Sequence, residues 1–226
     1  MSQKRLYLLD AYALIFRGYF AFIKNPRINS KGMDTSAIMG FMNALMDVIK
    51  REKPDHLAVA FDKGGSTYRY EMYQEYKAHR DETPEAIKIA VPYIQELLKA
   101  MHIPIIEVPG FEADHLIGTI AKQAEKENYQ VFMVTPDKQA EKENYQVFMV
   151  TPDKDFAQLV SENIFMYKPA RMGNDIEIWG IPEVLKKFEI ENPLQVIDFL
   201  GMMGDAADNI PGLPGGGEVT AKKLFK

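Results

Sequence analysis

Short apolar runs that end at an acidic residue recur along the chain. Residues 6–10 read Leu-Tyr-Leu-Leu-Asp, residues 57–62 read Leu-Ala-Val-Ala-Phe-Asp, and residues 147–150 form a third apolar run just before Asp153. Runs of this length that are apolar at almost every position are typical of strands buried on both faces. Residues 103–108 predict a further strand. The pattern therefore predicts a sheet whose carboxyl edge carries acids.

Amphipathic segments separate these strands. Between residues 35 and 50, apolar side chains recur three or four positions apart, and Thr35 or Ser36 precedes them as a candidate N-cap. Thr83 and Pro84 predict the start of another helix, with proline at its first helical position. Because strands and helices alternate, we expect an α/β fold with a mostly parallel central sheet and helices on both faces.

The pattern changes in the last third of the chain. Residues 164–167 and 176–179 predict two strands joined through a hairpin-type turn at Gly173 and Asn174. The remaining predicted elements are two short helices, a glycine-rich turn and the beginning of a last helix, at residues 182–188, 193–203, 204–218 and 219–226. That helix stops almost as soon as it begins, so we expect this last region to be truncated.

A sixteen-residue segment, KQAEKENYQVFMVTPD, occurs twice in direct succession, at residues 122–137 and 138–153. Solenoid proteins usually contain three or more longer and divergent repeats. An identical pair is therefore interpreted as either a recent duplication or an artificial one, and only one copy can supply the strand. The first copy is followed by Lys-Gln and the second by Lys-Asp, so we expect the second copy to be the functional one.

Composition narrows the possible chemistry. The chain has 226 residues, of which 46% are hydrophobic, enough for one large domain or one and a half. Because it contains no cysteine, a metal ion could be held only by oxygen or imidazole ligands, and no disulfide can form. No apolar segment approaches the length that spans a membrane. We therefore expect a soluble protein of the cytoplasm.

Eight acids stand at strand ends or helix starts, where α/β folds place their ligand sites. They are Asp10, Asp62, Glu112, Asp114, Asp153, Asp155, Asp205 and Asp208. If they converge, they could hold two divalent metal ions that activate a water for phosphodiester hydrolysis. The formal net charge of −5 is unusual for a nucleic-acid enzyme, but leaving out these eight charges turns it into +3.

The spacing of these acids favours a shared site. Asp205 and Asp208 would share a face in a helix, and Asp153 and Asp155 would share one if their strand continued that far. Any single one of these acids is more often a helix cap or a turn residue. Their number at such positions, and not the identity of any one, is what favours a metal site.

Two further segments could bind nucleic acid. Residues 63–83 are basic and rich in tyrosine, which suits phosphate contacts and base stacking along a single strand. The backbone N–H groups of Gly212, Gly215 and Gly217, ahead of a helix, could cradle a phosphate. From composition alone, residues 63–83 could also be a solvated surface loop, and the glycine-rich turn could be a flexible terminal loop. Together with the acids, these segments indicate a metal-dependent phosphodiesterase that acts on nucleic acid.

Six short motifs occur in a specific order. They are Leu-Leu-Asp (8–10), Ala-Phe-Asp (60–62), Tyr-Lys-Ala-x-Arg (76–80), Gly-Phe-Glu-Ala-Asp (110–114), Thr-Pro-Asp-Lys-Asp (151–155) and Gly-Asp-x-x-Asp-Asn-Ile-Pro-Gly (204–212). With this set, nearly the whole chain resembles the 5′-nuclease (5′-3′ exonuclease) domain of bacterial family A DNA polymerases, a member of the flap endonuclease superfamily. The resemblance implies an enzyme that uses two Mg²⁺ or Mn²⁺ ions to cut 5′ flaps and remove RNA primers.

The resemblance also implies roles for individual residues. The eight acids match the metal ligands, with His115 beside them at one metal position. Arg69, Lys77 and Arg80 match a helical arch at about residues 63–84, where Lys77 would stabilise the charge of the scissile phosphate. The residues expected to bind DNA are Arg17, Tyr76, Gly212, Gly215, Gly217 and Thr220. The segment from Gly204 onward matches a helix-three-turn-helix, which grips the duplex backbone, often together with a K⁺ ion.

The domain organisation follows from the same resemblance. It implies a PIN-like catalytic domain at residues 1–200 and the start of a helix-three-turn-helix DNA-binding region at residues 201–226. In the family this region continues beyond Lys226, and a polymerase domain follows in the polymerases. The expected partners are DNA with a 5′ flap or nick and an RNA primer. The protein is expected to be a monomer in the bacterial cytoplasm, away from membranes.

The chain departs from the family pattern near its proposed site. His115 stands where the family has a second aspartate, and imidazole ligates Mn²⁺ or Zn²⁺ but is a poor Mg²⁺ ligand. The duplication interrupts the connection beside it, and Gly216 and Val219 replace a branched apolar residue and a lysine. A catalytically disabled module that binds branched DNA therefore stays open. So does a ribonuclease of the small α/β metal-nuclease type, although the arch and the glycine turn argue against it.

Overall fold

A six-stranded sheet forms the centre of the computed structural model, which describes residues 4–64, 67–127, 145–170 and 175–225. The strand order is β3-β2-β1-β4-β5-β6, and every neighbouring pair is parallel except β5 with β6. The strands are β1 (Lys4–Asp10), β2 (His56–Ala60), β3 (Ile105–Ile106), β4 (Tyr145–Val150), β5 (Ile164–Lys168) and β6 (Glu177–Trp179). The mostly parallel sheet predicted from the sequence is confirmed.

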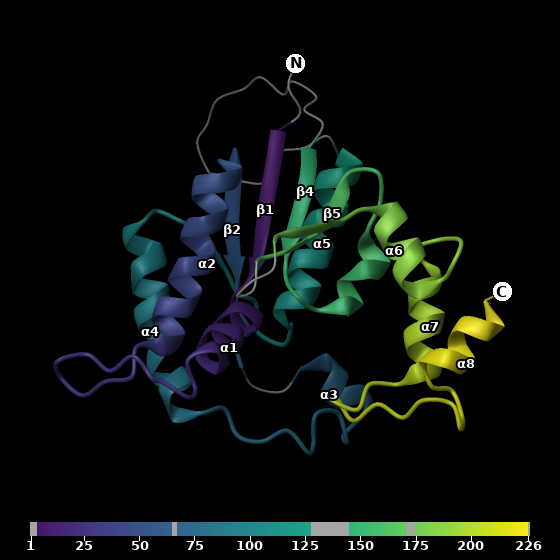
Figure 1. Cartoon of the computed structure of the whole chain (residues 1–226), viewed down its shortest axis with the longest axis horizontal. Coiled ribbons are helices and arrows are strands. Elements are labelled where there is room, and N and C mark those ends of the chain that lie inside the picture. The colour runs from purple at the N-terminus through teal and green to yellow at the C-terminus, as the bar shows by residue number, and fades with distance from the viewer. Residues whose placement is uncertain (1–3, 65–66, 128–144, 171–174, 226) are drawn as a thin grey trace.

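Helices cover both faces of this sheet, as predicted (Figure 1). One face carries α1 (Ala11–Ala21), α2 (Ser36–Glu52) and α4 (Glu85–Ala100), and the other carries α5 (Ala113–Glu127), the 3₁₀ helix η1 (Lys154–Leu159), α6 (Ile181–Phe188) and α7 (Gln195–Met203). The short helices α3 (Tyr68–Met72) and α8 (Glu218–Leu224) complete the described structure. Within the described residues, no helix is both long and apolar enough to cross a membrane.

Alternate residues of the central strand β1 pack into two separate hydrophobic cores, one on each face of the sheet. Leu6 and Leu8 of β1 pack in the core beneath α5, whereas Tyr7 and Leu9 pack in the core beneath α1, α2 and α4. All four side chains are at most 1% exposed. Because both faces of β1 are buried, the strand has to be apolar at every one of these positions. The uninterrupted apolar run in the sequence is the consequence.

The observed elements differ from the predicted ones mainly at their ends. Of residues 103–108, only Ile105–Ile106 pairs with β2. This strand lies at the sheet edge, and Pro104 has no N–H with which to extend the ladder. The helix α4 begins directly after Pro84, which is its N-cap, so the prediction of Pro84 as the first helical residue was wrong by one residue.

The C-terminal elements follow the predicted order. β5 and β6 are antiparallel, as a hairpin requires, but the predicted turn at Gly173 and Asn174 lies outside the described residues. The predicted helix at residues 193–203 begins at Gln195, and the last helix, α8, begins one residue before the predicted Val219.

The two copies of the repeated segment contribute to different elements. The helix α5 ends at Glu127, inside the first copy, whereas β4 and the acidic turn after it belong to the second copy. β4 lies between β1 and β5 in the interior of the sheet. The second copy is therefore the one that leads into Asp153 and Asp155. Residues 128–144, which include most of the first copy, lie outside the described part of the chain.

Candidate active site

Asp10 and Asp62 mark the carboxyl edge of two neighbouring parallel strands. Asp10 is the last residue of β1, and its Oδ1 accepts a hydrogen bond from the backbone N–H of Ala13 at 3.0 Å, which caps α1. Asp62 follows β2, and its Oδ1 accepts a hydrogen bond from the backbone N–H of Ala113 at 2.5 Å, at the start of α5. Both carboxylates therefore lie at the edge where parallel α/β sheets place ligand sites.

Two more pairs of acids come from the turns beside this edge. Glu112 directly precedes α5, and Asp114 lies in its first turn. Asp153 is the N-cap of η1 and Asp155 lies in its first turn. The strand before them ends at Val150, so it does not continue far enough for Asp153 and Asp155 to share a strand face. The cause is Pro152, which has no N–H to continue the ladder.

Asp205 and Asp208 lie in a turn after α7, as predicted for residues 204–218, so the helical face that their spacing would allow does not form. Gly204 ends α7 with a φ of 68°, a conformation that favours glycine. Asp205 and Ile210 then exchange two backbone hydrogen bonds, each 2.8 Å long. The turn directs the Asp208 side chain toward the arch, where its Oδ2 accepts a hydrogen bond from the Tyr76 hydroxyl at 3.1 Å.

The carboxylates influence one another electrostatically. Burial, and then the negative charges of Asp62 and Asp153, raise the pKa of Asp10 to about 7. Burial and the charges of Asp153 and Asp205 raise the pKa of Asp155 to about 6, and burial also raises the pKa of Asp62 and of Asp153. Acids from separate strands and turns therefore crowd one region with negative charge.

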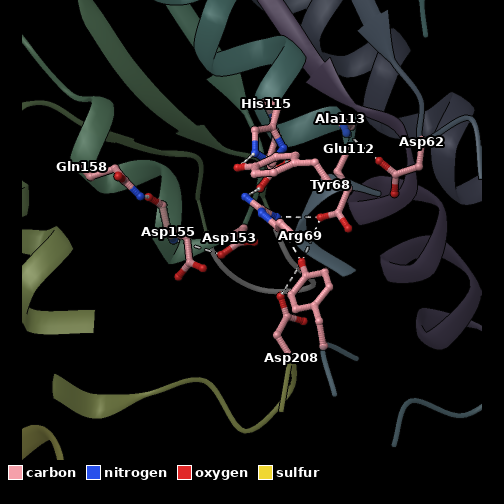
Figure 2. Close-up of polar contacts among 12 residues, drawn as sticks. Asp62, Tyr68, Arg69, Glu112, Ala113, His115, Asp153, Asp155, Gln158 and Asp208 are labelled. Atoms are coloured by element: carbon pink, nitrogen blue, oxygen red, sulfur yellow. Dashed lines mark hydrogen bonds and ion pairs between the residues drawn. The ribbon is translucent and has the colours of Figure 1, made fainter. Parts of the chain in front are cut away.

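Cations from the segment predicted as the arch lie among these acids, and Figure 2 shows one of them, Arg69. Arg69 donates from Nη1 to Oε2 of Glu112 and from Nη2 to Oδ2 of Asp114, both at 2.6 Å. Lys77 donates from Nζ to the same Glu112 oxygen at 3.0 Å. In the view of Figure 2, Arg69 lies in the middle of the group, between Glu112 and Asp153.

Tyr76 links the arch to two of the acids. Its side chain is only 6% exposed, and its hydroxyl accepts a hydrogen bond from Arg69 at 3.1 Å. The single hydroxyl proton can go either to Glu112, at 3.0 Å, or to Asp208, at 3.1 Å. The ring of Tyr76, which was expected to bind DNA, is thus buried beside the acids and not open to a base.

The arch is also fixed to the turn that carries Asp208. The backbone N–H of Lys77 donates to the carbonyl of Asp208 at 2.9 Å. Arg80 donates from Nε to the carbonyl of Ala207 at 3.1 Å, and its Nη2 forms an ion pair with the Asp208 carboxylate. The structure therefore brings the three predicted catalytic cations, Arg69, Lys77 and Arg80, to the acidic edge.

His115 lies at the rim of the acids, next to a cavity. Its Nε2 is 2.7 Å from the Tyr68 hydroxyl, and its Nδ1 is 2.9 Å from Oδ1 of Asp114. The rings of Tyr68 and Phe111 contact the imidazole, with centroids 4.9 and 6.2 Å away. A cavity of about 370 Å³ opens here, lined also by Asp155. The tyrosine-rich composition of residues 63–83 could have suggested Tyr68, and Phe111 belongs to the Gly-Phe-Glu-Ala-Asp motif, but neither residue was predicted to contact His115.

The glycine-rich turn forms a second hollow. Gly212, Gly215, Gly217 and Thr220 line a cavity of about 430 Å³ between α7 and α8. A Cβ on Gly212 would lie 2.3 Å from the carbonyl oxygen of Met203, so only glycine permits this close approach of two backbones. Gly215 has a φ of 78°, and a Cβ added to Gly215 or Gly217 would meet nothing within 4 Å. The open side of the turn is where a phosphate could approach.

Arg17 lies away from both hollows. It belongs to α1, and its Nη2 donates to the backbone carbonyl of Ala170, just after β5. Together with residues of α2, it lines a cavity of about 850 Å³ between these elements. The structure therefore does not bring Arg17 into the acidic group.

The donor set fits a hard divalent cation, although the acids are spread out. Among the described residues, no three acidic or histidine side chains are close enough to hold an ion by themselves. Mg²⁺ sites, however, typically use one or two carboxylates and keep several waters. Burial, and to a smaller extent the charges of neighbouring acids, raise the pKa values of Asp10 and Asp155, and a bound cation would favour their ionised forms. In addition, Oδ1 of Asp155 is buried without a hydrogen-bond partner among the described residues.

The architecture and the acidic edge define the class of protein. Zinc-bound T5 5′-exonuclease superposes with a TM-score of 0.69 at 21% identity, over 98% of this chain and 74% of that one. The bacteriophage T5 flap endonuclease, in a pseudo-enzyme–product complex with DNA and metal ions, gives a TM-score of 0.68 at 20% identity, with the same coverage. The chain thus has the α/β fold of the flap endonucleases.

The sequence comparisons give the family. Residues 5–141 match the family described as 5′-3′ exonuclease, N-terminal resolvase-like domain, and the chain belongs to it. It is 37% identical to a 5′-3′ exonuclease of Aquifex aeolicus, over 99% of this chain and 70% of that protein. It is 39% identical to DNA polymerase I of Bacillus subtilis, over 100% of this chain and 23% of the polymerase. The expected relationship to the nuclease part of bacterial DNA polymerase I is confirmed.

Proposed function

We propose that this chain is a divalent-metal-dependent 5′-3′ exonuclease and flap endonuclease. The observation that carries the proposal is that acids at the ends of β1 and β2 and at the starts of α5 and η1 lie along one edge of the sheet, two of them paired with Arg69 and Lys77. The names of the relatives, a 5′-3′ exonuclease and DNA polymerase I, support it. Its substrates are DNA with a 5′ flap or a nick, and the RNA of a primer.

The metal site is the acidic edge of the sheet. Two Mg²⁺ or Mn²⁺ ions held there would supply an activated water and stabilise the leaving oxygen. The proposed ligands are Asp10, Asp62, Glu112, Asp114, His115, Asp153, Asp155, Asp205 and Asp208. Because imidazole suits Mn²⁺ better than Mg²⁺, His115 favours Mn²⁺ at its position.

The arch would bind the scissile phosphate. Lys77 and Arg80 carry positive charge directly beside the acids, where it can stabilise the negative charge that develops on the phosphate oxygens. Tyr76 orients Glu112 or Asp208 through its hydroxyl and so keeps the carboxylates in place.

The C-terminal region would hold the rest of the DNA. Residues 201–226 form the proposed helix-three-turn-helix, and residues 1–200 the catalytic domain. The N–H groups of Gly212, Gly215 and Gly217 would face the phosphates of the duplex, with Thr220 beside them and a K⁺ ion as a further cofactor. Arg17, which lines a separate cavity beside α2, would contact the backbone of another part of the substrate.

A catalytically disabled module that binds branched DNA is the second candidate. It is favoured by the ion pairs of Arg69 and Lys77 with Glu112, which occupy oxygens that a metal would need, and by His115 in place of an aspartate. Binding to flap DNA that weakens with rising salt, without any cleavage, would support this module.

Cleavage of a labelled 5′-flap DNA tests the proposal. We expect the purified chain to cut the flap at its junction in Mn²⁺, to cut more slowly in Mg²⁺, and not to cut in EDTA. A His115→Asp variant should narrow the difference between the two metals. Binding without cleavage in either metal would identify the disabled module. Equal cutting of unbranched single-stranded RNA would identify a ribonuclease instead.

A further inference from the structure

Arg69 makes the most extensive ion-pair contact in the acidic group. Its two terminal nitrogens bridge Glu112 and Asp114, each at 2.6 Å, and Nη1 also donates to the Tyr76 hydroxyl at 3.1 Å. Its side chain is 31% exposed, and those of Glu112 and Asp114 are 11% and 29% exposed. Charge-assisted hydrogen bonds that are short and partly withdrawn from water are the strong ones. Arg69 thus occupies the carboxylate oxygens on both sides of the start of α5.

The acids at this edge differ in how their charge is neutralised. Glu112 and Asp114 receive a guanidinium, and Glu112 receives Lys77 as well. Asp10 instead accepts a hydrogen bond from the backbone N–H of Ala13 at 3.0 Å, and Oδ1 of Asp155 is buried without a hydrogen-bond partner among the described residues. A carboxylate oxygen that is engaged by a guanidinium cannot at the same time coordinate a metal ion through the same lone pairs. The protein therefore supplies its own cation to one half of the proposed metal site.

The helix that carries Arg69 is weakly held. α3 is five residues long, and none of its residues is buried. Its first residue, Tyr68, contacts the rest of the protein through a backbone hydrogen bond to Gly110 of 3.3 Å and through its hydroxyl to His115. Segments with few buried contacts move at low cost in free energy. Arg69 can therefore leave the two carboxylates without disturbing either core.

We propose that Arg69 is an internal counter-cation that competes with the divalent metal for Glu112 and Asp114. This inference rests on the proposed function, because it concerns the same site. In the free protein Arg69 lowers the affinity for metal. When DNA binds, its phosphate takes over the guanidinium, and the carboxylates become available to the ion. Metal binding and DNA binding then favour each other, and linkage requires that they do so by the same factor.

Titration calorimetry with Mn²⁺, in the absence of DNA, tests this competition. We expect Arg69→Gln to bind Mn²⁺ about tenfold more tightly than the parent chain, a size typical of coupling between two sites. Arg69→Lys should fall between the two, because an ammonium is a compact charge that cannot bridge both carboxylates as the planar guanidinium does. Melting curves in EDTA establish whether each variant is folded. If Arg69→Gln does not fold, the comparison of Arg69→Lys with the parent chain serves as the test.

A charge-matched control variant separates direct competition for the two carboxylates from the electrostatic effect of removing any nearby positive charge. Lys154 is exposed and lowers the pKa of neighbouring Asp155, but its charge does not bridge Glu112 and Asp114. Lys154→Gln should therefore change the Mn²⁺ affinity by less than about threefold, since exposed charges are screened by solvent and salt. A gain as large as that of Arg69→Gln would overturn the inference.

Two further outcomes distinguish this inference from the proposed function. If the parent chain binds Mn²⁺ as tightly as Arg69→Gln, Arg69 is not a competitor, and the proposed nuclease function is unaffected. If none of the proteins binds Mn²⁺, both the inference and the proposed metal site are wrong.

Discussion

An Asp10→Asn variant is expected to cut a 5′-flap DNA about 1,000-fold more slowly than the parent chain. An effect of this size is typical when a charged group that stabilises the transition state is lost. Asp10 ends the central strand β1, and its charge acts on Asp62, Asp153 and Asp114. Asparagine retains the oxygen that caps α1 through the N–H of Ala13, so the fold should be kept. What is lost is the negative charge that holds a metal ion. Single-turnover cleavage in Mn²⁺ measures the effect.

The same substitution should stabilise the metal-free protein. Because the pKa of Asp10 is raised from 3.8 to about 7, the folded state holds this proton more tightly than the unfolded state does. The stability that the proton provides is fully present below pH 4 and is lost as the pH rises through 7. In EDTA at pH 8, Asp10→Asn should therefore melt above the parent, by about 2–4 °C per kcal/mol gained. The difference should vanish toward pH 4.

Loss of cleavage together with a gain in metal-free stability would identify Asp10 as a metal ligand. A variant that is inactive and also less stable at pH 8 would point to a structural role for the carboxylate. A variant that still cuts within about tenfold of the parent rate would remove Asp10 from the set of metal ligands, because losing an essential charge costs more than that.

Lys77→Met is expected to reduce kcat about 100- to 1,000-fold and to change KM little, as for a group whose charge matters mainly in the transition state. The Lys77 ammonium lies 3.0 Å from Oε2 of Glu112 and 4.7 Å from the centre of the Tyr76 ring. It therefore reaches over the acids, to the place where a phosphate would be cut. Methionine keeps the length and the apolar stem of the side chain but removes the charge.

Lys63→Met is the matched control for this prediction. Lys63 stands at the start of the same arch but pairs with Glu107, at 3.4 Å, outside the acidic group. Its side chain is 46% exposed, and a surface ion pair contributes little. We expect its kcat to stay within about twofold of the parent, since exposed charges are screened. If Lys77→Met and Lys63→Met weakened DNA binding equally and left kcat unchanged, Lys77 would be only a binding residue.

Much of the fold could be predicted because the central strands are buried on both faces and are therefore apolar at successive positions in the sequence. β1 and β4 are apolar at successive positions, since their side chains enter two different cores. The edge strand β3 was predicted too long, because an apolar run does not reveal where a sheet ends or how Pro104 limits pairing. Strand length at an edge depends on neighbours that are distant in sequence.

The acids of the site could be predicted because they follow strands, but their local geometry could not. The spacing of Asp205 and Asp208 would place them on one face of a helix, but the left-handed φ of Gly204 ends α7 before them, and the direction of the Asp208 side chain in the turn could not be predicted. Tyr76 was expected to face DNA, and it is instead buried between Arg69 and the carboxylates. Such contacts join segments far apart in the chain, and no local pattern encodes them.

The most direct measurement of the central claim is the anomalous scattering of Mn²⁺ in crystals of this chain. The metal-dependent nuclease predicts two manganese peaks about 4 Å apart at the carboxyl edge of the sheet. They should lie between Asp10 and Asp62 on one side and Asp153 and Asp155 on the other. Manganese bound only at other places, with none at this edge, would contradict the claim that these acids form the catalytic metal site.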